Sequence, residues 1–186
     1  MSAFWIGIAV LAAGCLFAVV LIVFYNRFIR KKLKVENNFS EIKIQCKKRF
    51  DLVPNLVETV KGYAQHERET LERVTIARSA GVTANSVRDL AKANNQLTEV
   101  LNKLFALGEQ YPDLKASPNF MMLQNELVNI EKAIAVSRSF YNDAVMMYNE
   151  AIKTFPGNVF ASLFNFKEAE FFDAPEAEME NVRVSF

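Results

Sequence analysis

The amino-terminal part of the chain contains an uninterrupted apolar run that constrains everything after it. From Ala3 to Phe24, no side chain carries a charge or an amide. A helix of about 22 residues, rising about 1.5 Å per residue, is about 33 Å long and can cross a lipid bilayer. The run therefore predicts a membrane-spanning helix, and we assign residues 1–26 to a transmembrane anchor.

A basic segment follows the anchor directly, and we assign residues 27–36 to a juxtamembrane collar. Its basic residues are Arg27, Arg30, Lys31, Lys32 and Lys34, whereas no charged side chain precedes the anchor. Lys and Arg are enriched on the cytoplasmic side of membrane helices. The pattern predicts an amino terminus outside and a cytoplasmic carboxyl-terminal domain, with the collar against anionic lipid headgroups.

Two processing alternatives compete with an uncleaved anchor. A secretory signal would begin with basic residues and have a shorter apolar core, and the chain has neither feature. The segment Leu11–Cys15 has some likeness to a lipoprotein processing box, in which Cys15 would be lipidated after cleavage. Ala12 stands where a larger aliphatic residue is usual, and the apolar run continues to Phe24. We therefore favour the anchor.

Small side chains recur along one side of the anchor, at Ala3, Gly7, Gly14 and Ala18. Small residues let helices approach closely in lipid, so this stripe predicts self-association and a homo-oligomer. A lone anchor that happens to carry small residues is an equal alternative.

The composition excludes several classes of function. His66 is the one imidazole, and Cys15 and Cys46 are the two cysteines, so neither a zinc site nor a disulfide framework can be assembled. The six glycines form no phosphate-binding loop. The formal net charge is +1, and the basic residues concentrate in the collar, which argues against nucleic acid. We expect no cofactor and no metal, with Cys46 packed inside and His66 facing solvent.

Beyond the collar, apolar residues recur every three or four positions, the period of an amphipathic helix. The stripe from Phe39 to Ala64 keeps its phase across Pro54. We therefore expect one long first helix that is kinked at Pro54 and runs from the membrane to about Ala80, ending near Gly81.

Three further helices are expected. Ser86 is a candidate N-cap for a second helix that stops at Tyr111–Asp113, and Ser117–Pro118 opens a third with a heptad stripe that ends at Pro156–Gly157. A short fourth helix follows. No run alternates with period two, so strands are not expected. Residues 37–166 are predicted to form an all-α, antiparallel bundle of about four helices, and residues 167–186 an acidic tail.

Polar residues surround Pro54 in the first helix, namely Arg49, Asp51, Asn55 and Glu58. One interpretation makes this kinked cluster a docking site. The alternative is that Asn55 or a water bonds the carbonyls freed by the proline, while the charges form a solvated face.

A second set of polar residues forms a line beside the apolar stripe of the third helix. Its members are Gln124, Glu131, Arg138, Asn142 and Asn149. The line either meets Asn94, Asn95 or Gln96 inside the bundle and fixes helix register, or it faces solvent. No nucleophile has a base beside it and no paired carboxylates are evident, so we expect no catalytic residue.

The carboxyl-terminal part is aromatic, with Phe160, Phe164, Phe171 and Phe172. These rings either close the open end of the bundle, which we favour, or contact the membrane or a partner.

Several motifs resemble those of the LemA family of bacterial membrane proteins. The main one is KKRFDLVPNLVETVKGY at Lys47–Tyr63, and further blocks are Asn95–Leu97, Tyr111–Ala116, Arg138–Val145, Tyr148–Ile152 and Phe164–Lys167. The resemblance implies an anchored bundle of about four helices in the bacterial inner membrane. It implies no established activity or cofactor, so no catalytic role is carried over to any position.

These observations favour a non-enzymatic, membrane-anchored scaffold that self-associates or docks other membrane proteins. One alternative is a small-ligand sensor or unrecognised enzyme with a cleft near Arg138 and Asn142. Another is a lipid-remodelling protein that uses the collar and the aromatic ending.

Overall fold

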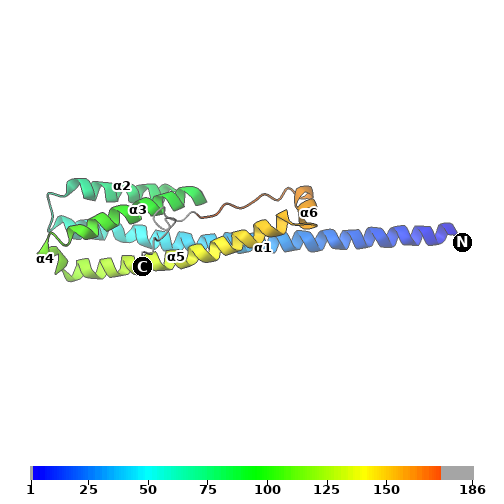
Figure 1. The fold of residues 1–186 in the computed structure, drawn as a ribbon, viewed down its shortest axis with the longest axis horizontal. Coiled ribbons are helices and arrows are strands. Elements are labelled where there is room, and N and C mark those ends of the chain that lie inside the picture. The colour runs from blue at the N-terminus through cyan, green and yellow to red at the C-terminus, as the bar shows by residue number, and fades with distance from the viewer. Residues whose placement is uncertain (1, 173–186) are drawn as a thin grey trace, which may run out of the picture. The chain divides into compact units, whose positions relative to one another are not determined.

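The computed structural model describes the backbone of residues 2–172 and the side chains of residues 4–172. The described part is helical and contains no strand, as predicted (Figure 1). Its elements are α1 (Ser2–Lys61), α2 (Arg68–Thr83), α3 (Val87–Leu107), α4 (Pro112–Lys115), α5 (Pro118–Lys153) and α6 (Gly157–Leu163). Most of the predicted acidic tail, from residue 173 on, lies outside the described residues.

The first helix is shorter than the sequence suggested. α1 continues through Pro54 but ends at Lys61, and the chain turns before α2 begins at Arg68, so the expectation of one helix to about Ala80 is wrong. The turn keeps Ala64 buried, and Leu71 then begins a new buried stripe on α2. Because the apolar phase passes through the turn, the periodicity did not reveal the break.

The predicted starts of the later helices agree with the structure, whereas α3 ends at Leu107, before the expected stop at Tyr111. Ser86 caps α3, since its hydroxyl accepts a hydrogen bond from the Asp89 backbone N–H at 3.0 Å. α5 begins at Pro118 and ends at Lys153, and α6 is the expected short last helix. The single turn of α4 lies between the predicted second and third helices and was not expected.

The chain divides into two compact units. Unit 1 contains the described residues up to Asn38 together with Asn142–Ala169, and unit 2 contains Phe39–Tyr141 together with the described residues from Glu170 on. α1 and α5 therefore each contribute residues to both units.

The core of unit 2 is built from aliphatic stripes of α1, α3 and α5. Its fully buried aliphatic side chains include Ile42, Leu56, Leu97, Leu101, Leu104, Leu127 and Ile134. Within each helix, successive members of this set are separated by three, four, seven or twice seven residues. Such spacings place them on one side of their helix, and the three sides face the same interior. Of these residues, all but Leu56 belong to the stripes that the period predicts.

A glycine sets the approach of α2 to α1 in unit 2. A Cβ atom added at Gly81 would overlap the ring of Phe50 on α1. Gly81 is therefore a packing position inside α2, where the sequence had suggested the end of a helix.

In unit 1, aromatic rings join α6 to α1. Phe24 stacks on Phe160 with ring centroids 4.5 Å apart, and Tyr25 and Phe28 meet Phe164 and Phe166 edge to face or tilted. Phe160 and Phe164 thus pack on the end of the apolar run and not on the predicted bundle, whereas Phe172 is buried in unit 2 and Phe171 is exposed.

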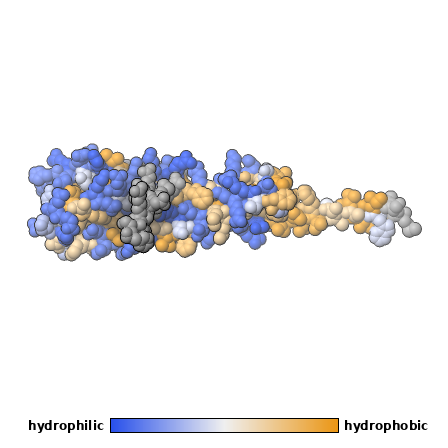
Figure 2. Space-filling view, viewed as in Figure 1, coloured by the Kyte–Doolittle hydropathy of each residue, from blue (hydrophilic) through white to orange (hydrophobic). Residues whose placement is uncertain are grey.

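The amino-terminal stretch of α1 remains uncovered. Among the described helices, α1 alone is long and apolar enough to cross a membrane. Large apolar side chains from Phe4 to Val19 are exposed, and Figure 2 shows this stretch as mostly hydrophobic surface. The helix has the length and composition of a membrane anchor.

Candidate functional site

The most buried charged side chain among the described residues is Arg49 of α1, which is only 3% exposed. One of its terminal nitrogens, Nη1, lies 2.7 Å from Asn94 Oδ1 and 2.9 Å from Thr98 Oγ1, both on α3. The same nitrogen lies 2.5 Å from Glu131 Oε2 on α5. Arg49 therefore ties three helices of unit 2 together through one guanidinium group.

Two effects act in opposite directions on the pKa of Arg49. Burial lowers the pKa of the guanidinium, and the Glu131 carboxylate acts in the opposite direction. An arginine side chain has so high an intrinsic pKa that it stays charged. The pair is thus a buried ion pair whose worth lies in fixing how the helices pack, because desolvation offsets much of its attraction.

Cys46 lies one turn before Arg49 and is also buried. Burial raises the pKa of its thiol to about 12, although the charge of Arg49 opposes that shift. A thiol with so high a pKa is protonated at neutral pH and is a poor nucleophile. Its sulfur lies 4.0 Å from Asn94 Oδ1, so Cys46 is part of the packing.

The predicted cluster around Pro54 is divided by the structure. Arg49 faces the interior, whereas Asp51, Pro54, Asn55 and Glu58 are exposed. Asp51 pairs with Lys47 at 2.6 Å and Glu58 with Lys61 at 2.7 Å, each on the same side of the same helix. Arg49 is therefore not part of an exposed polar cluster.

The proline is accommodated by a residue that the sequence did not single out. Pro54 has no N–H, so the Phe50 carbonyl four residues earlier loses its helical partner. Arg78 of α2 supplies one, with Nε 2.9 Å from that carbonyl oxygen. The expected partner was Asn55 or a water, and the structure shows instead a guanidinium from the neighbouring helix at this carbonyl.

The predicted polar line on α5 is distributed over both units. Glu131 pairs with Arg49 in unit 2, where Gln124 and Arg138 are partly buried, while Asn142 and Asn149 belong to unit 1. The line thus does reach Asn94, but through Arg49.

Asn149 holds the extended segment that follows α6. Its amide donates to the Ala169 carbonyl and accepts from the Ala169 N–H, both at 2.9 Å. Tyr148 donates to the Lys167 carbonyl at 2.9 Å in the same unit. Tyr148 lies in the predicted apolar stripe and Asn149 in the predicted polar line, but the sequence did not show that they bind backbone.

The anchor and collar residues lie on α1, and the collar is mostly exposed. Lys32 is 3.8 Å from Glu36, and a Cβ added at Gly7 or Gly14 would meet nothing within 4 Å. The side chain of Ala3 lies outside the described residues, and Ala18 is exposed.

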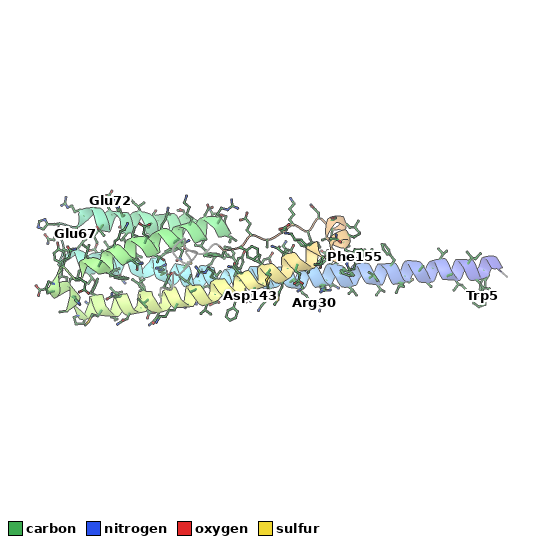
Figure 3. All side chains as sticks on the ribbon, viewed as in Figure 1. Trp5, Arg30, Glu67, Glu72, Asp143 and Phe155 are labelled. Carbon is green, nitrogen blue, oxygen red and sulfur yellow. The ribbon has the colours of Figure 1, made fainter. Side chains whose placement is uncertain are left out.

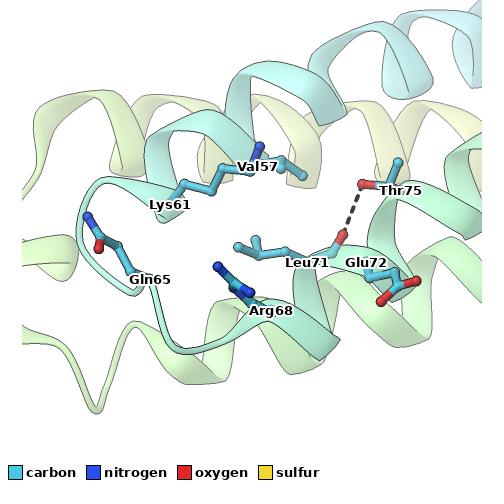
Figure 4. Close-up of a pocket in the computed structure, with 7 residues that line it drawn as sticks. All are labelled: Val57, Lys61, Gln65, Arg68, Leu71, Glu72 and Thr75. Carbon is cyan, nitrogen blue, oxygen red and sulfur yellow. Dashed lines mark hydrogen bonds between the residues drawn. The ribbon is translucent and has the colours of Figure 1, made fainter.

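A cleft of about 520 Å³ opens at the turn between α1 and α2 (Figure 4). Lys61, Gln65, Arg68 and Glu72 line its rim, and Val57 and Leu71 its apolar floor. Lys61 already bonds Glu58, and the rim side chains are exposed. The cleft therefore lacks a buried polar group that would orient a ligand.

No three His, Cys, Asp or Glu residues of the described chain gather into a group that could hold a metal ion. His66 is exposed, as expected.

Together these features define a class: an all-α protein with a candidate membrane anchor, whose two most buried polar side chains, Asn94 and Arg49, bind each other. The model of the LemA family matches residues 38–186, so the chain belongs to the LemA family. The match begins after the collar and includes Arg49 and its partners Asn94, Thr98 and Glu131.

Individual relatives cover most of the chain. Protein LemA of Metamycoplasma hominis is 29% identical over 86% of this chain and 74% of its own length. Magnetosome protein MamQ 2 of Paramagnetospirillum magneticum is 26% identical over 87% of this chain and 69% of its own length. Magnetosome protein MamQ of Magnetospirillum gryphiswaldense is 24% identical over 84% and 67%.

Proposed function

We propose that this protein is a non-enzymatic scaffold, anchored by α1 in the bacterial cell membrane with its helical units on the cytoplasmic side. It docks either a second copy of itself or another membrane protein. The anchor supplies the location and the collar fixes its height at anionic headgroups. The helix surface supplies the contact.

The observation that carries this proposal is a set of exposed apolar side chains on one side of α5 in unit 2. Its members are Met121, Met122, Val128 and Val136, and the exposed polar residues Asn125, Asn129 and Lys132 lie among them. Exposed apolar side chains that share one side of a helix mark protein contacts, and methionine adapts to differently shaped partners. We call these four residues the α5 face.

The buried chemistry of unit 2 agrees with a scaffold. Arg49, Glu131 and Cys46 are the groups that an enzyme would use, yet Arg49 pairs with Glu131, and both Arg49 and Cys46 contact Asn94 of α3. The family name and the names of the relatives denote no enzymatic activity.

Site-specific photo-crosslinking in the membrane tests the proposal. A photoreactive residue replaces Val136, which is 56% exposed, and in a matched control it replaces Val82 of α2, which is 58% exposed. We expect adducts from position 136 and few from position 82. An adduct of twice the subunit mass identifies a second copy, and one of another mass identifies a companion protein. Absence of adducts at 136, or equal yields at both positions, contradicts the proposal.

A small-ligand sensor is the second candidate function. Its candidate site is the cleft at the α1–α2 turn, in place of the predicted region near Arg138 and Asn142. Lys61 and Arg68 on the rim suit a small anion. A rise in melting temperature on addition of phosphate or a dicarboxylate, lost in Arg68→Ala, would favour this function.

A further inference from the structure

An apolar ridge lies at the junction of α5 and α6 in unit 1. It consists of Phe155, Val159 and Leu163, which are 83%, 57% and 63% exposed. Figure 3 labels Phe155 at this junction, where its side chain projects from the ribbon. Val159 and Leu163 lie one turn apart on α6, and Phe155 lies two residues before that helix, so this short segment exposes three large apolar side chains that a partner surface could cover.

The opposite side of α6 fixes the ridge to a particular level of α1. Phe160 stacks on Phe24 at 4.5 Å, and Phe164 meets Tyr25 at 5.1 Å. Phe24 is the last residue of the apolar run. A hydrocarbon core about 30 Å thick accommodates about 20 helical residues, so a span that begins near Phe4 leaves it near Phe24. The ridge therefore lies at the level where the anchor leaves the hydrocarbon.

The backbone at this junction is adapted to hold α6 there. A Cβ atom added at Gly157 would overlap the Ala151 carbonyl and lie 3.6 Å from the Phe28 ring. Only glycine lets the chain turn this closely against the end of α5, and the start of α6 then lies in ordinary contact with Phe28 of α1.

The charge pattern at this level suits a lipid surface. α6 itself carries no charged residue, so its exposed face ranges from polar, at Asn158 and Ser162, to apolar, at Val159 and Leu163. The collar lies on the same unit directly after Tyr25. An apolar face beside basic residues is the pattern of a segment that lies in the interface of an anionic bilayer.

We propose that the ridge inserts into the interfacial region of an anionic phospholipid bilayer. Unit 1 then contacts lipid twice, once through the spanning part of α1 and once through α6. This inference rests on the anchoring role proposed for α1. It adds a second membrane contact that the apolar run alone does not require.

Depth-dependent quenching of tryptophan fluorescence tests it. The full chain is reconstituted in vesicles of phosphatidylcholine and phosphatidylglycerol, with or without lipids brominated near the headgroup end of the acyl chain. In a Trp5→Phe background, which removes the one native tryptophan, Phe155→Trp and Leu163→Trp place reporters on the ridge. Asn37→Trp, exposed on α1 about 18 Å beyond Tyr25 at 1.5 Å per residue, is the matched aqueous control.

We expect blue-shifted emission and about twofold quenching by brominated lipid at positions 155 and 163, and little at 37. Ser162→Trp, on the polar edge of α6, should be quenched less than Leu163→Trp. Adding Gly157→Val should reduce quenching at position 155, because the overlap with Ala151 displaces α6.

Two results would overturn the inference. Red-shifted, unquenched emission at 155 and 163 would mean that the ridge faces water. Blue-shifted emission without bromine quenching would mean that protein covers the ridge, either a second copy or a partner. The native Trp5 is the control for the anchor: quenching of Trp5 by lipid with no quenching at 155 and 163 rejects the ridge while leaving the anchoring role intact.

Discussion

Arg49 shows how much of the packing of unit 2 depends on a single side chain. It joins α1 to Asn94, Thr98 and Glu131, so its removal leaves the Glu131 carboxylate without its cation. Breaking a buried pair by removing one partner is far more harmful than never having had the pair.

We therefore expect Arg49→Met to destabilise the protein by about 2–3 kcal/mol, a value reduced because Glu131 is about one-third exposed (34%). Denaturant titration in detergent measures it. Arg49→Met with Glu131→Met should recover part of the loss. Lys47→Ala, which breaks an exposed pair, is the control and should change stability by less than about 1 kcal/mol. Equal effects at positions 47 and 49 would contradict the assignment.

The thiol of Cys46 makes the folding stability of unit 2 depend on pH in the alkaline range. Its pKa rises from 9.0 to about 12 on folding, so above pH 9 the unfolded chain loses this proton first. The contribution of Cys46 to the free energy of unfolding is therefore complete below pH 9. It falls between pH 9 and 12, by up to about 1.4 kcal/mol per pH unit. Cys46→Ala should flatten that part of the curve relative to the wild type. Parallel curves for both proteins would be the contrary result.

At the scale of the helices, the structure explains why prediction succeeded where it did. α3 and α5 carry Ser86 and Pro118 at their starts, and such local signals do not depend on the rest of the chain. α2 begins after Glu67, whose side chain makes no cap hydrogen bond. With no capping residue and an unbroken apolar phase, the sequence held no signal for that boundary.

The candidate site was predicted less completely than the fold. A contact of Asn94 with the polar line that contains Glu131 was one of two equal interpretations, and Arg49 was placed with its exposed sequence neighbours. Arg78 was missed because its partner is a backbone carbonyl 28 residues away, and a contact of that kind leaves no pattern in one sequence. Periodicity predicts which face is buried but does not identify hydrogen-bond partners across helices.

The bond from Arg78 to the Phe50 carbonyl should matter only because of Pro54. We expect Arg78→Met to destabilise the protein by about 1–2 kcal/mol, since it leaves a carbonyl unsatisfied. In a Pro54→Ala background, the new N–H bonds Phe50 and the same change should have little effect. A double-mutant cycle measured by denaturant titration gives the coupling. Additive effects would show that the two residues act independently.

The contact between α2 and α1 predicts a size limit at Gly81. Gly81→Ala should destabilise the protein by about 1–3 kcal/mol, because the new methyl overlaps the Phe50 ring. Phe50→Leu in the same chain should relieve part of that loss. Gly62→Ala is the matched control: its Cβ would lie 3.4 Å from the Thr59 carbonyl oxygen, an ordinary contact. Thermal unfolding in detergent distinguishes the two sites.

At the scale of the whole molecule, the orientation of the anchor decides which compartment meets the α5 face. The basic residues all follow the span, so green fluorescent protein fused after Phe186 should fluoresce and alkaline phosphatase fused there should be inactive. Neutralising the five collar residues and adding lysines before Phe4 should reverse both results. An active phosphatase fusion in the unmodified chain would reject the cytoplasmic placement.

The hydrogen bond from Arg78 to Phe50 also bears on the order in which the chain acquires its structure. A ribosome releases α1 before α2, so for an interval the carbonyl opposite Pro54 has only water as a partner. The hydrogen bonding of α1 around Pro54 is complete only when α2 has packed against α1. A nascent chain stalled before Arg78 should accordingly show faster amide exchange around Phe50 than one stalled after α2.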